Sequence, residues 1–121
     1  MIVDDHASFR RVARLVLLAV GLDVVGEAAD AGSARELIER LEPDAVLLDV
    51  MLPDGSGLDV ARELVGRPYA PRVVLTSSRS RSDFEASFDL PGGCEFIPKH
   101  ELSGPALAEL LECGTNAGDE G

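Results

Sequence analysis

Residues 45–57 of the chain read AVLLDVMLPDGSG, an apolar run that ends in an acid and leads into a loop. A continuous apolar run such as Ala45–Asp49 is typical of a central parallel strand that helices cover on both faces. Proline, aspartate, glycine and serine gather in Pro53–Gly57, which predicts a loop. The apolar spacing after the loop predicts a helix over Leu58–Val65. This stretch therefore predicts the strand, loop and helix of an α/β domain.

The same alternation continues toward both ends of the chain. Short apolar runs predict four further strands, over Met1–Val3, Asp23–Ala28, Arg72–Thr76 and Cys94–Ile97. Helical spacing of apolar residues predicts four further helices, over Phe9–Val20, Ser33–Leu41, Ser82–Leu90 and Ser103–Cys113. Strands that alternate with helices form a parallel sheet with helices on both faces. We therefore expect one α/β domain over residues 1–113, and a flexible tail over residues 114–121 because these are small and polar.

The composition indicates a globular domain with an excess of acid. Acidic residues outnumber basic residues by 22 to 11, and the net charge is −11. Such a charge disfavours direct binding to nucleic acid or to an anionic membrane. The apolar runs are too short to span a membrane and the first residues lack a signal-peptide pattern, so we expect a cytoplasmic location. Cys94 and Cys113 lack the spacing of metal ligands, and we expect both to be free thiols.

Polar residues that can support chemistry stand at the ends of the predicted strands. Asp4 and Asp5 follow the first strand, Asp49 and Thr76 end two others, and Lys99 follows the last. The carboxyl ends of parallel strands lie along one edge of the sheet, so these side chains should converge there. Carboxylates that are crowded together repel one another, and a hard divalent cation relieves this repulsion. The edge therefore predicts a magnesium site.

Four motifs resemble the signatures of bacterial response-regulator receiver domains, which are the phosphorylated modules of two-component signalling. They are Ile2–His6, Leu47–Gly57, Val74–Ser77 and Phe96–Lys99, and the resemblance runs from Met1 to about Glu112. It implies a flavodoxin-like, doubly wound five-stranded parallel sheet with strand order 2-1-3-4-5. The first strand is shorter than is usual in this family. Since Pro98 precedes the lysine and His100 follows it, the motif style is closest to receivers that are fused to helix-turn-helix domains.

The resemblance assigns the phosphoacceptor and the metal ligands. Asp49 would accept the phosphoryl group. Asp4 and Asp5 would hold Mg²⁺ together with Asp49 and the backbone carbonyl of Met51. Phosphotransfer and dephosphorylation would be self-catalysed, so the chain is expected not to be an enzyme with a substrate of its own.

The resemblance also assigns a switch and its partners. Thr76 would hydrogen-bond the phosphoryl group, Lys99 would pair with it, and Phe96 would turn inward when Thr76 moves. A sensor histidine kinase or a phosphotransfer protein would be the donor. A downstream protein, or an effector domain fused to a longer chain, would read the altered face, and a homodimer is possible.

Two other classes of function stay open. A phosphatase of the haloacid-dehalogenase type also uses a strand-end aspartate, but it needs a second acid two residues later, where this chain has Met51. A receiver-like module could instead bind proteins without phosphorylation. For single residues, Asp4 and Asp5 could be helix N-caps, Thr76 an ordinary strand-end residue, and Phe96 a core aromatic.

Overall fold

The computed structural model describes residues 1–68, 70–80, 82–84 and 89–111. Its main sheet has five parallel strands in the order β2-β1-β3-β6-β7. The strands are β1 (Ile2–Val3), β2 (Glu27–Ala28), β3 (Ala45–Asp49), β6 (Arg72–Ser77) and β7 (Cys94–Pro98). Counted within this sheet alone, the order is 2-1-3-4-5, so the predicted fold class is confirmed.

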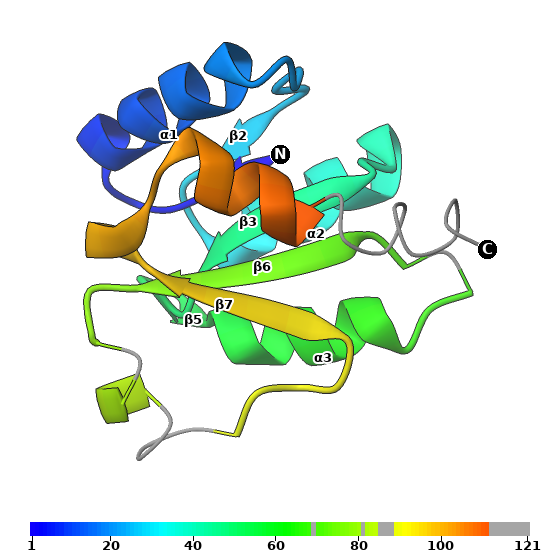
Figure 1. Ribbon diagram of the computed structural model, residues 1–121. Helices are drawn as coiled ribbons and strands as arrows, with labels where there is room; N and C mark the ends of the chain where they lie inside the picture. Colours follow the sequence, from blue (N-terminus) through cyan, green and yellow to red (C-terminus); the bar gives the residue numbers. More distant parts are fainter. Residues whose placement is uncertain (69, 81, 85–88, 112–121) are drawn as a thin grey trace, which may run out of the picture.

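Helices cover the sheet on both faces (Figure 1). The described helices are α1 (Ala7–Ala19), α2 (Ala31–Leu41), α3 (Gly57–Val65), the 3₁₀ turn η1 (Lys99–Glu101), and helical residues at 82–84 and 104–111. Side chains of α2 and α3 belong to one buried cluster, and side chains of α1 and of helix 104–111 belong to a second. The sheet is therefore doubly wound. No helix in the described residues is long and apolar enough to cross a membrane.

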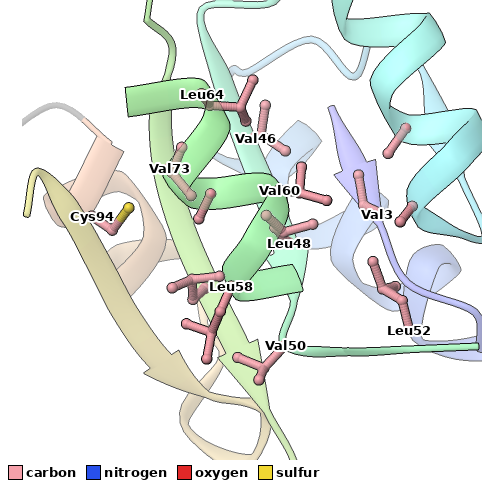
Figure 2. Packing of buried hydrophobic residues seen from close by; sticks show 14 of the residues in the cluster. Val3, Val46, Leu48, Val50, Leu52, Leu58, Val60, Leu64, Val73 and Cys94 are labelled. Atoms are coloured by element: carbon pink, nitrogen blue, oxygen red, sulfur yellow. The ribbon is translucent and has the colours of Figure 1, made fainter. Parts of the chain in front are cut away.

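The central strand β3 supplies side chains to both clusters. Val46 and Leu48 point into the cluster beneath α3, where Figure 2 shows them beside Leu64 and Val60. Leu47 points to the opposite face and packs in the second cluster. Each fully buried side chain of this kind stabilises the fold by about 1.5–3 kcal/mol. Burial on both faces explains why the run is continuously apolar, and it fixes where the polar end of β3 emerges.

The structure corrects several predicted boundaries in the first half. The first helix comprises Ala7–Ala19 instead of Phe9–Val20. The second strand comprises only Glu27–Ala28 instead of Asp23–Ala28, because its neighbour β1 begins at Ile2 and pairs with Glu27. The next helix begins at Ala31 instead of Ser33, because the Asp30 carboxylate caps it by accepting a hydrogen bond from the Ser33 backbone amide.

Two further corrections concern segments that were predicted as a loop and as a helix. The predicted loop Pro53–Gly57 belongs to a short antiparallel hairpin, β4 (Met51–Leu52) with β5 (Gly55–Ser56), and Gly57 already starts α3. Of the helix predicted over Ser82–Leu90, residues 82–84 are helical and residues 89–90 are irregular, while residues 85–88 lie outside the described residues. Cys113 and the predicted tail also lie outside them. Cys94 is a free, buried thiol as predicted.

Candidate functional site

The carboxyl edge of the sheet brings the predicted site residues together. Asp4 follows β1 directly, Asp49 ends β3, and Thr76 of β6 is the register partner of Asp49. Lys99 follows β7 as the first residue of η1. A cleft of about 290 Å³ opens at this edge, and Asp5, Asp49 and Lys99 are among its lining residues.

Three carboxylates form the centre of this edge. Asp4 is fully buried and Asp49 is 4% exposed, whereas Asp5 lies at the surface. One ligand atom from each of these residues and from His6 falls within 4.8 Å of the others. Oxygen donors at such spacing suit a hard divalent cation, which would offset the repulsion of the buried charges. The residues therefore fit a metal site, and Asp4, Asp5 and Asp49 among them are carboxylates that the sequence predicted as metal ligands.

His6 is a neighbour that the sequence prediction left out. Its Nδ1 atom lies 3.2 Å from Asp4 Oδ1 and 3.2 Å from Asp5 Oδ1. Its backbone amide donates a hydrogen bond to Asp4 Oδ1 at 2.8 Å. The signal was available, because His6 directly follows the acidic pair in the sequence. The two contacts with Asp4, from the ring and from the backbone amide of His6, hold its carboxylate in place at the start of α1.

Lys99 joins the two buried acids. Its Nζ atom lies 2.7 Å from Asp4 Oδ2 and 3.1 Å from Asp49 Oδ2. The ammonium also lies over the ring of Phe9, whose centroid is 4.5 Å from Nζ. Burial opposes the charged ammonium, but the contacts with Asp4 and Asp49 outweigh it and raise the pKa of Lys99. Lys99 is therefore held as a cation between the carboxylates.

The two buried acids differ in how readily they ionise. Burial opposes ionisation of Asp4, but the contacts with Lys99 and His6 outweigh it and lower the pKa of Asp4. Burial raises the pKa of Asp49 to about 6, and the negative charge of Asp4 adds to the effect, against the Met51 amide and Lys99. Asp49 is thus an ionised but poorly solvated carboxylate at neutral pH, which suits a nucleophile.

The segment after Asp49 folds back tightly over it. The backbone amide of Met51 donates a hydrogen bond to Asp49 Oδ1 at 3.0 Å. The amide of Gly57 donates to the Val50 carbonyl at 2.8 Å. A Cβ atom at position 57 would lie 2.0 Å from the Asp49 carbonyl oxygen, so only glycine fits at the start of α3. The tight turn after Asp49 places the Met51 backbone beside the acidic cluster. The Met51 side chain is exposed.

Thr76 and Phe96 are buried residues that do not line the cleft. Thr76 is buried, and its Oγ1 atom has no hydrogen-bond partner among the described residues. A buried hydroxyl without a partner costs stability, so its presence is consistent with a partner that arrives later. Phe96 lies in the core and stacks on Phe84, with ring centroids 4.1 Å apart. The structure therefore does not bring Phe96 to the acidic cluster, and its switch role stays a prediction.

Comparison with known proteins gives consistent matches. A family model described as the response regulator receiver domain matches residues 1–111. Protein-glutamate methylesterase/protein-glutamine glutaminase 5 of Myxococcus xanthus is 37% identical, and the match covers 91% of this chain and 35% of that protein. The DNA-binding transcriptional activator DevR/DosR of Mycobacterium tuberculosis is 32% identical, with 92% of this chain and 51% of that protein covered. The chain thus spans a third to a half of the length of these relatives.

Solved structures agree with this likeness. A two-component response regulator of the LuxR family from Aurantimonas sp. SI85-9A1 matches with a TM-score of 0.78 and 30% identity. The match covers 97% of this chain and 84% of that one. The similarity therefore extends over nearly the whole chain.

Proposed function

Since the chain belongs to the response regulator receiver domain family, we propose that Asp49 is its phosphoacceptor. The observation that carries the proposal is the convergence of Asp4, Asp5 and Asp49 with Lys99 at one edge of the sheet. The sequence prediction of a receiver domain of two-component signalling is confirmed. The roles of the individual residues are the proposal.

The proposed reaction is phosphoryl transfer from a phosphohistidine to Asp49. A carboxylate oxygen of Asp49 attacks phosphorus, the P–N bond of the donor breaks, and its electron pair returns to the imidazole, which takes up a proton. The product is an acyl phosphate on Asp49. Lys99 Nζ, 3.1 Å from Asp49 Oδ2, stabilises the charge of the transferring group. Since the pKa of Asp49 is about 6, the carboxylate is ionised for attack at neutral pH.

We assign the metal site to Mg²⁺. Asp4, Asp5 and Asp49 would hold it with the backbone carbonyl of Met51. Magnesium prefers few protein carboxylates and keeps sites for water or phosphate oxygens. This matches a cluster of three carboxylates beside an open cleft. When bound, Mg²⁺ supplies positive charge to the phosphoryl oxygens.

The donor in this proposal is a sensor histidine kinase or a phosphotransfer protein. The output is a change in a protein-binding face, read by a target protein or by a domain fused to the receiver. Thr76 would offer its unpartnered hydroxyl to the phosphoryl oxygens, and Phe96 would follow as the aromatic switch. A cytoplasmic location and a possible homodimer belong to the same proposal.

Intact mass spectrometry tests the acceptor. After incubation with acetyl phosphate and Mg²⁺, the wild-type chain should gain the mass of one phosphoryl group, and Asp49→Asn should gain none. Asp23→Asn, an exposed acid outside the acidic cluster, serves as the matched control and should label normally. Full labelling of Asp49→Asn would refute the assignment. A wild type that never labels, with this donor or a phosphorylated phosphotransfer protein, would instead favour a phosphorylation-independent binding module.

Metal dependence is tested separately. A ligand that binds only the folded state raises the melting temperature by mass action, so millimolar Mg²⁺ should stabilise the wild type. Asp5→Ala should lose most of this response, because it removes the exposed carboxylate of the set. If the wild type shows no shift with Mg²⁺, the proposed metal site is wrong.

A further inference from the structure

An exposed acid links the segment after Asp49 to the start of helix α2, which follows strand β2. Asp54 lies in the turn between β4 and β5, and neither the metal site nor the phosphoryl chemistry uses it. Its Oδ1 atom accepts a hydrogen bond from the backbone amide of Ala31 at 2.7 Å. Its Oδ2 atom accepts one from the amide of Gly32 at 3.0 Å. Both carboxylate oxygens of Asp54 are therefore bound to the first turn of α2.

Helix α2 has a cap of its own without Asp54. The Asp30 carboxylate accepts from the Ser33 amide at 2.7 Å, which is the usual side-chain N-cap. A helix start has four backbone amides without an intrahelical partner, and Asp54 binds two of those that the Asp30 cap does not reach. The two acids thus bind the same helix end, but only Asp54 comes from the segment that follows Asp49.

The hairpin that carries Asp54 also carries the backbone beside the acidic cluster. Met51 pairs with Ser56 and Leu52 pairs with Gly55 in this hairpin. The Met51 amide is bonded to Asp49 Oδ1. Leu52 is buried in the cluster that includes Ala31 of α2. The hairpin is therefore held on one side by Asp49 and on the other by α2.

Electrostatics favours the same link. The positive end of the α2 dipole lies at its first turn, where an anion is stabilised. The hydrogen bonds from Ala31 and Gly32 lower the pKa of Asp54, so its carboxylate stays charged well below neutral pH. The link therefore persists over the pH range in which Asp49 is ionised.

We propose that Asp54 is a positioning residue that fixes the Met51–Ser56 hairpin against α2 and thereby sets the affinity of the acidic site for a divalent cation. Asp54 does not touch the cation or the phosphoryl group. It acts by holding the backbone of Met51 in place. Residues that support a metal ligand without touching the metal are known to change metal affinity in this way. This inference rests on the proposed function, because it assumes that the acidic site binds Mg²⁺.

Isothermal titration calorimetry with MgCl₂ alone tests the proposal on the full chain. Asp54→Ala should raise the Kd for Mg²⁺ by about tenfold, the lower end of the effect of losing such an outer partner. Asp54→Asn keeps one side-chain oxygen, that of an uncharged amide, as an acceptor and should give an intermediate Kd. Asp30→Ala weakens the same helix end without touching the hairpin, and its Kd should equal that of the wild type.

A kinetic experiment separates positioning from loss of folding. With acetyl phosphate, Asp54→Ala should label slowly at low Mg²⁺ and reach the wild-type rate at saturating Mg²⁺, because the chemical groups are intact. Equal Mg²⁺ affinity in the wild type, Asp54→Ala and Asp54→Asn would overturn the inference and leave the proposed function standing. If the wild type itself binds no Mg²⁺, the proposed function fails first. If Asp54→Ala is unfolded by circular dichroism, the Asn variant decides by the same criterion.

Discussion

Thr76 is the register partner of Asp49 across the β3–β6 pair, and its buried hydroxyl has no hydrogen-bond partner among the described residues. An unpartnered hydroxyl in a buried position costs about 1–3 kcal/mol. In the proposed function, this hydroxyl would donate to a phosphoryl oxygen on Asp49. The cost of leaving it without a partner in the unphosphorylated protein can then be measured separately from the response to phosphorylation.

The first prediction exchanges this hydroxyl for a methyl group. Thr76→Val should stabilise the unphosphorylated protein by about 1 kcal/mol, because valine has a similar shape and no unpaired polar atom. Urea unfolding measures this change. Thr76→Ser keeps the hydroxyl and is the control, which should not gain stability.

Substitutions of Thr76 also test the switch, and Thr76→Ala is added to the two variants above. In the wild type, beryllofluoride with Mg²⁺ should alter amide exchange mainly between Thr76 and Leu111. Thr76→Ala and Thr76→Val should still accept phosphate but lose most of this change, whereas Thr76→Ser should keep it. A change that falls mainly in Phe9–Leu41 would place the output face elsewhere and contradict the roles of Thr76 and Phe96.

The second prediction concerns pH and Asp49. Burial raises the pKa of Asp49 to about 6, whereas in the unfolded chain it is about 3.9. Between these values the folded state binds a proton that the unfolded state has released, so this group lowers stability as the pH rises. We compare the free energies of unfolding of Asp49→Asn and of the wild type in EDTA. The difference between them should shift in favour of Asp49→Asn by about 2 kcal/mol as the pH rises from about 4 to about 7. Urea unfolding at each pH measures the difference, and a difference that does not vary with pH would contradict the shift.

The third prediction concerns the shared cation. Lys99→Met removes the ammonium that lies between Asp4 and Asp49. In EDTA the variant should lose about 3 kcal/mol, because two buried carboxylates lose the cation that they share. Mg²⁺ should then raise its melting temperature by more than it raises that of the wild type. Lys99→Arg keeps the charge and should respond like the wild type, and equal Mg²⁺ shifts in all three proteins would show that Lys99 does not balance these acids.

The fourth prediction concerns the glycine at the start of α3. A Cβ atom at Gly57 would lie 2.0 Å from the carbonyl oxygen of Asp49, so Gly57→Ala must displace either α3 or the end of β3. We expect a loss of about 3 kcal/mol and slower phosphorylation of Asp49. Gly92→Ala is the control, since a Cβ atom there meets nothing within 4 Å. Wild-type stability and labelling in Gly57→Ala would contradict the close approach.

Most of the fold was predictable, because buried strands and helix faces have apolar residues at characteristic spacings in the sequence. The run Ala45–Asp49 is apolar at every position up to its acid, since both of its faces are covered. The spacing of apolar residues marked α1 and α3 to within two residues of their observed starts. By contrast, the length of β2 was not predictable, because it depends on where its neighbour β1 begins.

Local sequence pattern was enough to predict that Asp4, Asp49 and Lys99 reach the carboxyl edge, because parallel strands place their ends together whatever their separation along the chain. How these side chains are paired depends on the tertiary structure. It placed Lys99 closer to Asp4 than to Asp49, left the Thr76 hydroxyl without a partner, and bound Asp54 to the start of α2. These contacts join residues that are 22 or more positions apart, or depend on how deeply an atom is buried. Local pattern carries no information about such distances, since they are set by strand register and by the packing of helices against the sheet.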